Sequence, residues 1–272
     1  MRWLGLEGNA AIVTGGASGI GRACCLGLAD AGVKVVIADV NEKDGEQLAV
    51  SLCEGYGGDH IFVKTDVADK KSVDNMIVVA LNAFGRVDIL VNNAGILIPR
   101  LLVDPVGKEE LTEEIWDKVT SINQKGIFLC AQAAAREMIK SGKGGVIINM
   151  TSESGLEGSE GQSVYAATKG AIYSLTRSWA KELGKHNIRV VGLAPGILEV
   201  TALRSEEYER ALAYTRGISI AQLRAGNEKV SIPMGRSGKL SEVADAVCFA
   251  VSERASYIHG TTINISGGKS RG

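Results

Sequence analysis

Three residues in the segment TSESGLEGSEGQSVYAATKGA, 151–171, have the types and spacing needed to move a proton. Tyr165 and Lys169 are four residues apart, so on a helix they share one face, with their Cβ atoms about 5–6 Å apart. A nearby cation favours the phenolate, and Lys169 is therefore expected to lower the tyrosine pKa from its usual value of about 10. Tyr165 can then exchange a proton with an alcohol or a carbonyl, while the Ser152 hydroxyl holds the same substrate oxygen.

A Tyr and Lys pair at this spacing is common on helix surfaces, so its meaning depends on the surrounding elements. Strands rich in Val and Ile alternate with helices, which predicts an α/β fold with a parallel sheet covered on both faces. We predict a single domain over residues 1–272 with a doubly wound, Rossmann-type sheet of seven parallel strands. The expected strands lie in AAIVTGG, KVVIADV, HIFVKTDV, VDILVNNAG, GGVIINMTS, IRVVGLAPG and TTINISGG.

The segment at about 197–235 interrupts this alternation. After APG, 194–196, the chain runs to PMGRSG with no predicted strand and contains two helical pieces, SEEYERALAYTRG and SIAQLRAGNEKV. So long an excursion inside a compact domain is usually functional. We expect a lid or a substrate wall, and the alternative is a simple surface decoration.

A glycine-rich turn, TGGASGIG at 14–21, joins the first predicted strand to the first helix. Its glycines let the backbone approach a pyrophosphate, which the free N–H groups of the helix N-terminus can bind. Asp39 ends the second predicted strand, where a carboxylate accepts hydrogen bonds from ribose hydroxyls and repels a 2′-phosphate. These features predict NAD rather than NADP as the cofactor. The alternative role for Asp39 is to cap the helix that follows, without contact to a cofactor.

Two further strand ends are expected in the same cleft. Asp66 follows the third strand and is placed near the adenine. The loop NNAG, 92–95, follows the fourth strand, and ligands of open parallel sheets bind outside the carboxyl ends of the strands. We interpret Asn93 as a brace between neighbouring strands.

Taken in order, these motifs resemble those of the short-chain dehydrogenase/reductase family. TGGASGIG, NNAG, Asn123 in SINQKG, Ser152, YAATK and APG together cover residues 6–268. The resemblance implies hydride transfer with a nicotinamide dinucleotide and no metal. It implies that Tyr165 is the acid/base, that Lys169 also binds the nicotinamide ribose, that Ser152 orients the substrate and that Asn123 supports a proton-relay water.

The resemblance also implies a cofactor-binding set along the strand ends. Position 200 is Val where the family often has Thr, which leaves open whether Thr201 contacts the carboxamide. The residues expected to bind the cofactor are Gly15, Ser18, Gly19, Ile20, Gly21, Asp39, Asp66, Val67, Asn93, Ala94, Gly95, Tyr165, Lys169, Pro195, Gly196 and Leu198.

Residues near the catalytic set point to a polar, anionic substrate. Glu153 directly follows Ser152. A carboxylate at this position would accept hydrogen bonds from the hydroxyls of a polyol and would disfavour an apolar substrate. The alternative is that Glu153 is a solvated loop residue with no role in binding. Guanidinium groups suit a phosphate or carboxylate, and basic residues in the variable segments are Arg100, Arg204, Arg216, Arg224 and Lys229. For any one of them the alternative is a plain surface residue. The residues predicted to contact substrate are Arg100, Glu153, Gln162 and Arg204.

The variable segments IPRLLVDP, SEGQS, RSWAKELGK and LRSEEYERALAYTRG resemble those of bacterial family members that act on a hexitol phosphate. This implies the oxidation of sorbitol 6-phosphate to fructose 6-phosphate with NAD. Three alternatives stay open at this point: a dehydrogenase of a free sugar or polyol, a reductase of 3-oxoacyl thioesters, and a nucleotide-binding scaffold without activity.

The composition of the chain limits the classes of binding partner that can be expected. The net charge is −1, from 30 basic and 31 acidic residues, so neither nucleic acid nor an anionic membrane is predicted as a partner. No signal peptide or membrane helix is predicted. The five cysteines are odd in number and lack a CxxC motif, which predicts reduced thiols in a cytoplasmic protein and no zinc site. The family resemblance implies a homodimer or homotetramer.

Overall fold

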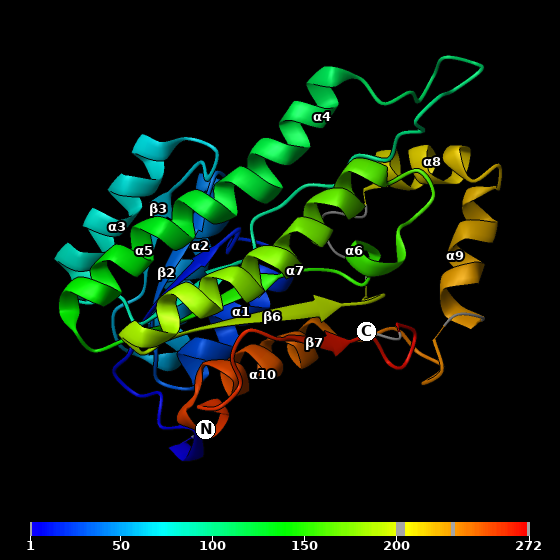
Figure 1. Ribbon diagram of the computed structural model, residues 1–272. Helices are drawn as coiled ribbons and strands as arrows, with labels where there is room; N and C mark the ends of the chain where they lie inside the picture. The colour runs from blue at the N-terminus through cyan, green and yellow to red at the C-terminus, as the bar shows by residue number, and fades with distance from the viewer. Residues whose placement is uncertain (1, 200–204, 230–231, 271–272) are drawn as a thin grey trace.

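The centre of the protein is a sheet of seven parallel strands, seen in a computed structural model that describes residues 2–199, 205–229 and 232–270 (Figure 1). The strand order is β3-β2-β1-β4-β5-β6-β7, so the order reverses between β1 and β4 and opens a crevice at the carboxyl ends there. The predicted Rossmann-type sheet is confirmed. The strands are β1 (Ala10–Thr14), β2 (Lys34–Asp39), β3 (Ile61–Lys64), β4 (Ile89–Asn92), β5 (Gly145–Met150), β6 (Ile188–Pro195) and β7 (Thr262–Ile265).

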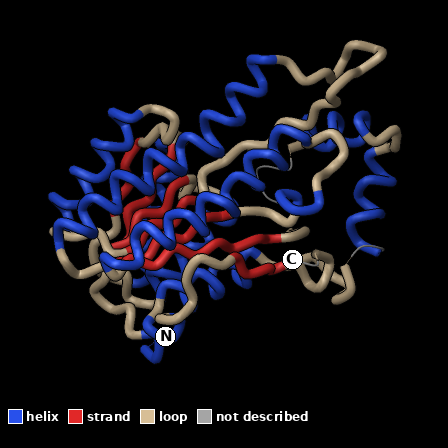
Figure 2. The backbone as a smooth tube through the Cα atoms, viewed as in Figure 1, coloured by secondary structure: helices blue, strands red, loops and turns tan. Residues whose placement is uncertain are grey.

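Helices cover both faces of the sheet (Figure 2). One face packs against α1 (Gly19–Asp30), α2 (Glu42–Tyr56) and α10 (Leu240–Val251), and the other against α3 (Lys70–Phe84), α5 (Ile127–Ser141) and α7 (Ser163–Leu183). Because side chains alternate along a strand, Ile12 of β1 joins the second core while its neighbours Ala11 and Val13 join the first. Both faces of the sheet are therefore apolar, as the Val- and Ile-rich strands predict.

Helix α10 was not assigned from the sequence. Its residues Val243, Val247 and Val251 recur every four positions and are buried, so the helical period was present in the sequence. The helix packs against α1 at Gly27, where an added Cβ would lie only 3.3 Å from the side chains of Ala244 and Cys248. Glycine at this position allows the close approach of the two helices.

The helix predicted from about Thr112 is divided by a wider turn. It consists of α4 (Glu113–Thr120), a π-helical turn (Ser121–Gly126) and α5. Gly126 ends the turn where an added Cβ would be 2.7 Å from the Val67 side chain. The turn thus lies directly against the loop after β3, and single π-helical turns are frequent at functional sites.

The excursion after β6 forms two helices, α8 (Glu206–Thr215) and α9 (Ile220–Lys229). Figure 1 shows both beyond the tip of β6, apart from the helices that cover the sheet. They share a small apolar core of Leu212, Ala213 and Leu223. The base of the excursion is closed where Gly238 N donates to Ile197 O (3.0 Å) and Glu199 N donates to Gly238 O (2.9 Å). Single-domain organisation stays a prediction.

Short helices complete the described structure. The loop predicted after β5 contains α6 (Ser154–Glu157), and 3₁₀ helices occupy Arg2–Leu4, Gly184–His186 and Glu253–Ala255. A search of the described helices finds none with the length and apolar character required to cross a bilayer.

We predict opposite effects for two glycine substitutions in α2. An added Cβ at the buried Gly45 would lie 2.2 Å from the Phe62 ring, so Gly45→Ala should lower the free energy of unfolding by about 1–3 kcal/mol through overpacking. At the exposed Gly55 nothing lies within 4 Å, and Gly55→Ala should raise it by about 0.5–1 kcal/mol through helix propensity. Urea unfolding of both variants tests this, and equal shifts would contradict the proposed packing.

Candidate active site

A cleft of about 730 Å³ opens at the carboxyl ends of the strands. Most of the predicted site residues line it, because they stand at strand ends or in the loops that follow. From the predicted cofactor set these are Gly15, Ser18, Gly19, Ile20, Asp39, Asp66, Val67, Asn93, Ala94, Gly95, Pro195, Gly196 and Leu198. From the predicted catalytic and substrate sets they are Ser152, Glu153, Gln162, Tyr165 and Lys169.

The glycine-rich loop has the geometry that close contact with a phosphate requires. Gly15 and Gly19 have φ values of 62° and 53°, in the left-handed region that favours glycine. Gly21 does not line the cleft, but an added Cβ there would lie 2.0 Å from the Gly15 carbonyl oxygen, so it allows α1 to pack against the loop. The N-terminus of α1 therefore faces the cleft with Ser18, Gly19 and Ile20, as a dinucleotide pyrophosphate needs.

Asp39 connects the end of β2 to the glycine-rich loop. Its carboxylate accepts hydrogen bonds from the backbone N–H of Ala17 (3.0 Å) and of Asn41 (2.9 Å). The helix-cap alternative for Asp39 is wrong, because Asn41 is the N-cap of α2 and accepts from Asp44 N. Asp39 thus brings a fixed carboxylate to the cleft beside the loop.

The loops after β3 and β4 complete this half of the cleft. Asp66 is exposed, and its carboxylate accepts from Ala68 N (2.9 Å). The Asn93 amide donates to the carbonyls of Thr14 (3.0 Å) and Gly15 (3.1 Å). Asn93 therefore links β4 to β1 across the crevice, the bracing position that its sequence context suggested, while it also lines the cleft.

Ser152, Tyr165 and Lys169 are brought together where β5 ends and α7 crosses it. Lys169 is buried, and its Nζ donates to the Met150 carbonyl (2.8 Å) and lies 5.6 Å from the centre of the Tyr165 ring. An added Cβ at Gly155 would lie 2.7 Å from the backbone of Lys169, so glycine allows the loop after Ser152 to approach α7. The Ser152 hydroxyl accepts from Ser154 Oγ (3.0 Å).

The structure corrects the expected direction of the tyrosine pKa. Burial raises the pKa of Tyr165 to about 12, and this outweighs a hydrogen bond with Ser152 that lowers it. Burial also lowers the pKa of Lys169 to about 8. The physical reason is that both groups lose hydration in the cleft, which disfavours the phenolate and the ammonium alike.

Asn123 lies behind the cleft rather than in its wall. It is fully buried in the π-helical turn, and its amide donates to Ile96 O (2.8 Å) and Thr168 Oγ1 (3.3 Å). Its Oδ1 accepts from Ile96 N (2.8 Å). The side chain thus ties the loop after β4 to α7, and the predicted support of a proton-relay water stays a prediction.

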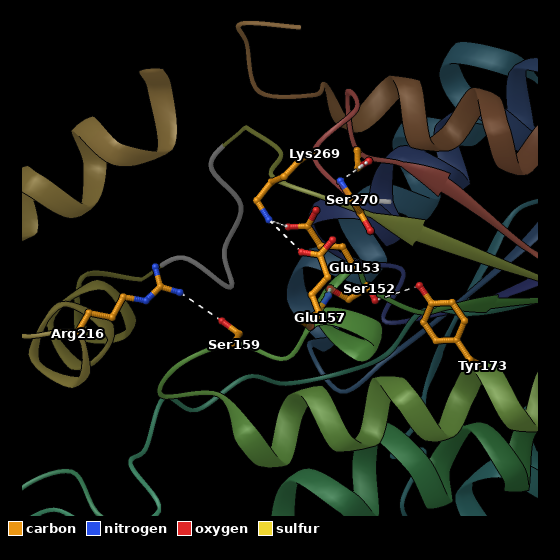
Figure 3. A network of polar contacts seen from close by, with 10 residues as sticks. Ser152, Glu153, Glu157, Ser159, Tyr173, Arg216, Lys269 and Ser270 are labelled. Atoms are coloured by element: carbon orange, nitrogen blue, oxygen red, sulfur yellow. Dashed lines mark hydrogen bonds and ion pairs between the residues drawn. The ribbon is translucent and has the colours of Figure 1, made fainter. Parts of the chain in front are cut away.

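Glu153 is not a solvated loop residue, so that alternative is wrong. The residue is 8% exposed, and its Oε1 accepts from Lys269 Nζ at 2.5 Å (Figure 3). Lys269 also approaches Glu157, at 3.9 Å, and lines the cleft. The sequence interpretation missed Lys269, because no local pattern relates two residues 116 positions apart.

The basic residues singled out in the sequence have different positions. Arg100 is not among the residues that line the cleft, and its guanidinium pairs with Glu109 (2.5 Å) in the loop after β4. Its predicted substrate contact stays a prediction. Arg224 pairs with Glu209 (2.6 Å) on α8, whereas Arg216 lines the cleft. Arg204, Val200 and Thr201 lie outside the described residues.

Among the residues that the structure describes, no group of three or more His, Cys, Asp or Glu side chains is arranged to hold a metal ion.

Comparison with known proteins agrees with this geometry. The family model for short chain dehydrogenases matches residues 9–211. Sorbitol-6-phosphate 2-dehydrogenase from Klebsiella pneumoniae is 54% identical over 99% of both chains. A 3-oxoacyl-[acyl-carrier-protein] reductase from Thermotoga maritima is 37% identical over 97% of this chain and 98% of its own.

Solved structures show the same similarity. A 3-ketoacyl-(acyl-carrier-protein) reductase from Brucella melitensis, complexed with NADH, matches with a TM-score of 0.80 and 33% identity, covering 97% of this chain and 99% of its own. Levodione reductase matches with a TM-score of 0.85 and 31% identity, covering 96% and 97%. The present chain belongs to the short-chain dehydrogenase family, as its motifs indicated, and it is an enzyme of that oxidoreductase type. The predicted nicotinamide cofactor agrees with this membership.

We predict that Tyr165→Phe lowers kcat by about 10²–10⁴-fold, because the variant lacks the hydroxyl that exchanges the substrate proton. Steady-state kinetics measures the loss, and fluorescence titration with NADH checks that dinucleotide binding is retained. The matched control is Tyr257→Phe, which removes a hydroxyl from a fully exposed side chain (102%) and should leave kcat unchanged. A fully active Tyr165→Phe variant would contradict the assignment.

Proposed function

We propose that this protein oxidises sorbitol 6-phosphate at C2 to fructose 6-phosphate with NAD. The observation that carries the substrate is the 54% identity to the Klebsiella pneumoniae sorbitol-6-phosphate 2-dehydrogenase over nearly the whole of both chains. The cleft supports the same choice, since Glu153, Gln162 and Arg216 give its wall hydrogen-bonding and cationic groups that suit a phosphorylated polyol.

In the proposed reaction, Ser152 at the end of β5 acts together with Tyr165 and Lys169 on α7. Ser152 offers its hydroxyl to the C2 oxygen of the substrate, with Ser154 fixing its orientation (3.0 Å). Tyr165 receives the hydroxyl proton as the C2 hydride leaves. Lys169 keeps its place beside the Tyr165 ring through its hydrogen bond to Met150 O. When bound, the oxidised nicotinamide supplies the hydride acceptor and a positive charge that favours the phenolate.

The preference for NAD over NADP rests on Asp39. Its carboxylate is fixed by two backbone N–H groups at the edge of the cleft, and a 2′-phosphate beside it would suffer like-charge repulsion. The cleft-lining residue that follows it, Val40, is exposed and uncharged, so it offers no cation to offset that repulsion.

The alternative of a 3-oxoacyl thioester reductase has less support. The relative with that name is 37% identical, compared with 54% for the polyol phosphate dehydrogenase. A cleft that holds the part-buried Glu153–Lys269 pair also suits an acyl chain poorly, because charged groups disfavour apolar ligands. A free sugar or polyol differs from the proposed substrate only in the phosphate, so a direct assay must separate the two.

We propose that the protein is a cytoplasmic homodimer or homotetramer. The exposed aromatic side chains of Trp116 on α4 and Phe128 on α5 (46% and 42%) support association through these helices. Light scattering measures the mass in solution, and a monomer would rule this assembly out.

We predict that sorbitol 6-phosphate is oxidised with a kcat/KM at least about 100-fold above that of sorbitol, when each is assayed with NAD. The reason is that charge-assisted hydrogen bonds to a phosphate contribute about 1.5–3 kcal/mol each, and every 1.4 kcal/mol is a factor of ten. Equal kcat/KM values for the two substrates would contradict the proposal that the enzyme recognises the phosphate group.

We predict that Asp39→Asn lowers the ratio of kcat/KM for NAD to that for NADP by about tenfold or more, because it removes the charge that repels the 2′-phosphate. Thermal melting is measured alongside, since Asp39 also holds Ala17 N. A wild-type enzyme that prefers NADP would overturn the cofactor proposal.

A further inference from the structure

Three cationic side chains line the cleft among the residues described, namely Lys169, Arg216 and Lys269. Of these described side chains, the best partner for a phosphate dianion is one with charge to spare. Their existing partners therefore decide which end of the cleft can hold the phosphate.

Lys169 belongs to the reacting end. It is 4% exposed, its Nζ donates to Met150 O, and it lies beside the Tyr165 ring. The reaction takes place at C2 of the substrate, whereas the phosphate is on C6 at the other end of the carbon chain. Lys169 is therefore in the wrong place to hold the phosphate.

Lys269 is already neutralised by carboxylates. Its Nζ is 2.5 Å from Glu153 Oε1 and 3.9 Å from Glu157 Oε2, as the dashed lines in Figure 3 show. A phosphate dianion beside Lys269 would also face these two carboxylates, and like charges at short range repel strongly in a partly buried site. Glu153 Oε2 is buried with no hydrogen-bond partner of its own, which suits a substrate hydroxyl better than a phosphate.

Arg216 differs from both lysines. It directly follows α8, is half-buried, and donates from Nη2 to the Ser159 hydroxyl at 3.3 Å (Figure 3). Within the described ranges no carboxylate forms an ion pair with it, in contrast to Arg224, which is paired with Glu209. Arg216 and Ser159 both line the cleft, so the guanidinium brings an uncompensated charge to it.

The loop that carries Ser159 is held firmly against α8. Gly161 has a φ of 73°, and an added Cβ there would lie 2.2 Å from Thr215 Oγ1, so glycine permits the close approach. Gln162 Nε2 donates to the Tyr208 hydroxyl (3.1 Å), a second link to the same helix. The positions of Ser159 and Arg216 relative to each other are therefore set by the fold before any substrate binds.

We propose that Arg216 and Ser159 form the subsite that binds the phosphate of the substrate. The guanidinium donates in a fork to two phosphate oxygens, and the Ser159 hydroxyl donates to another. Ser152 and Tyr165 hold the C2 oxygen, so the substrate lies along the loop 158–162. This assignment rests on the proposed function, because it presupposes a phosphorylated substrate.

The test compares substrates within one variant. Arg216→Gln should lower the ratio of kcat/KM for sorbitol 6-phosphate to that for sorbitol by about 10–100-fold, the loss of one or two charge-assisted hydrogen bonds. The inhibition constant of inorganic phosphate against sorbitol 6-phosphate should rise by a similar factor. Arg216→Lys, which keeps the charge without the fork, should give an intermediate loss.

Two matched variants separate this subsite from its rivals. Arg224→Gln removes a neighbouring arginine whose charge is taken by Glu209, and it should keep the wild-type ratio. Lys269→Gln should alter both substrates alike, because Lys269 acts on Glu153. A ratio that survives Arg216→Gln, or one that collapses in Lys269→Gln instead, overturns the assignment to Arg216. A wild-type enzyme without preference for sorbitol 6-phosphate overturns the proposed function itself, which is a distinguishable result.

Discussion

All seven strands run in one direction, so their carboxyl ends lie at the same edge of the sheet. The cleft exists because of this constraint. Gly15 and Ser152 are more than a hundred positions apart, yet both line the cleft. The parallel sheet places them there, because each follows the carboxyl end of a strand. Hydrogen bonds then tie this edge together: Asn93 joins the end of β4 to β1, and Lys169 joins α7 to the end of β5.

Burial of the side chains in the cleft changes their pKa values. It raises the pKa of Tyr165 and lowers that of Lys169, so burial disfavours the charged form of each group relative to water. In such an environment a positive charge brought beside the tyrosine has a large effect on its proton affinity, since water does little to screen it. The same reasoning explains why Glu153, buried one residue from Ser152, is found with a lysine partner.

Much of this arrangement could be predicted from local patterns. The seven strands, the glycine-rich loop and the Tyr165–Lys169 pair follow from the alternation of apolar segments and from spacing within one helix. Other features depend on contacts between distant segments and left no local signal. These include the Lys269 partner of Glu153. The close approach of Gly126, in the π-helical turn, to Val67 after β3 is another contact of this kind. The pairing of Arg100 with Glu109 lies within one loop, but that loop has no regular helical or strand period from which the contact could be predicted. Helix α10 is different, because its buried residues Val243, Val247 and Val251 recur at a helical period that is visible in the sequence itself.

The hydrogen bonds that close the base of the excursion after β6 affect how far its sequence can change without loss of the fold. Residues 197–199 and Gly238 bond to each other, and α8 and α9 have an apolar core of their own. Substitutions in α8 and α9 should therefore disturb the sheet little, because neither helix, in the part that the structure describes, supplies a residue to the apolar cores on the two faces of the sheet. A new specificity can arise by changes in this wall of the cleft, while Ser152 at the end of β5 and the pair Tyr165 and Lys169 on α7 keep their places. The fold in this sense separates the part of the enzyme that is free to diversify from the part that is not.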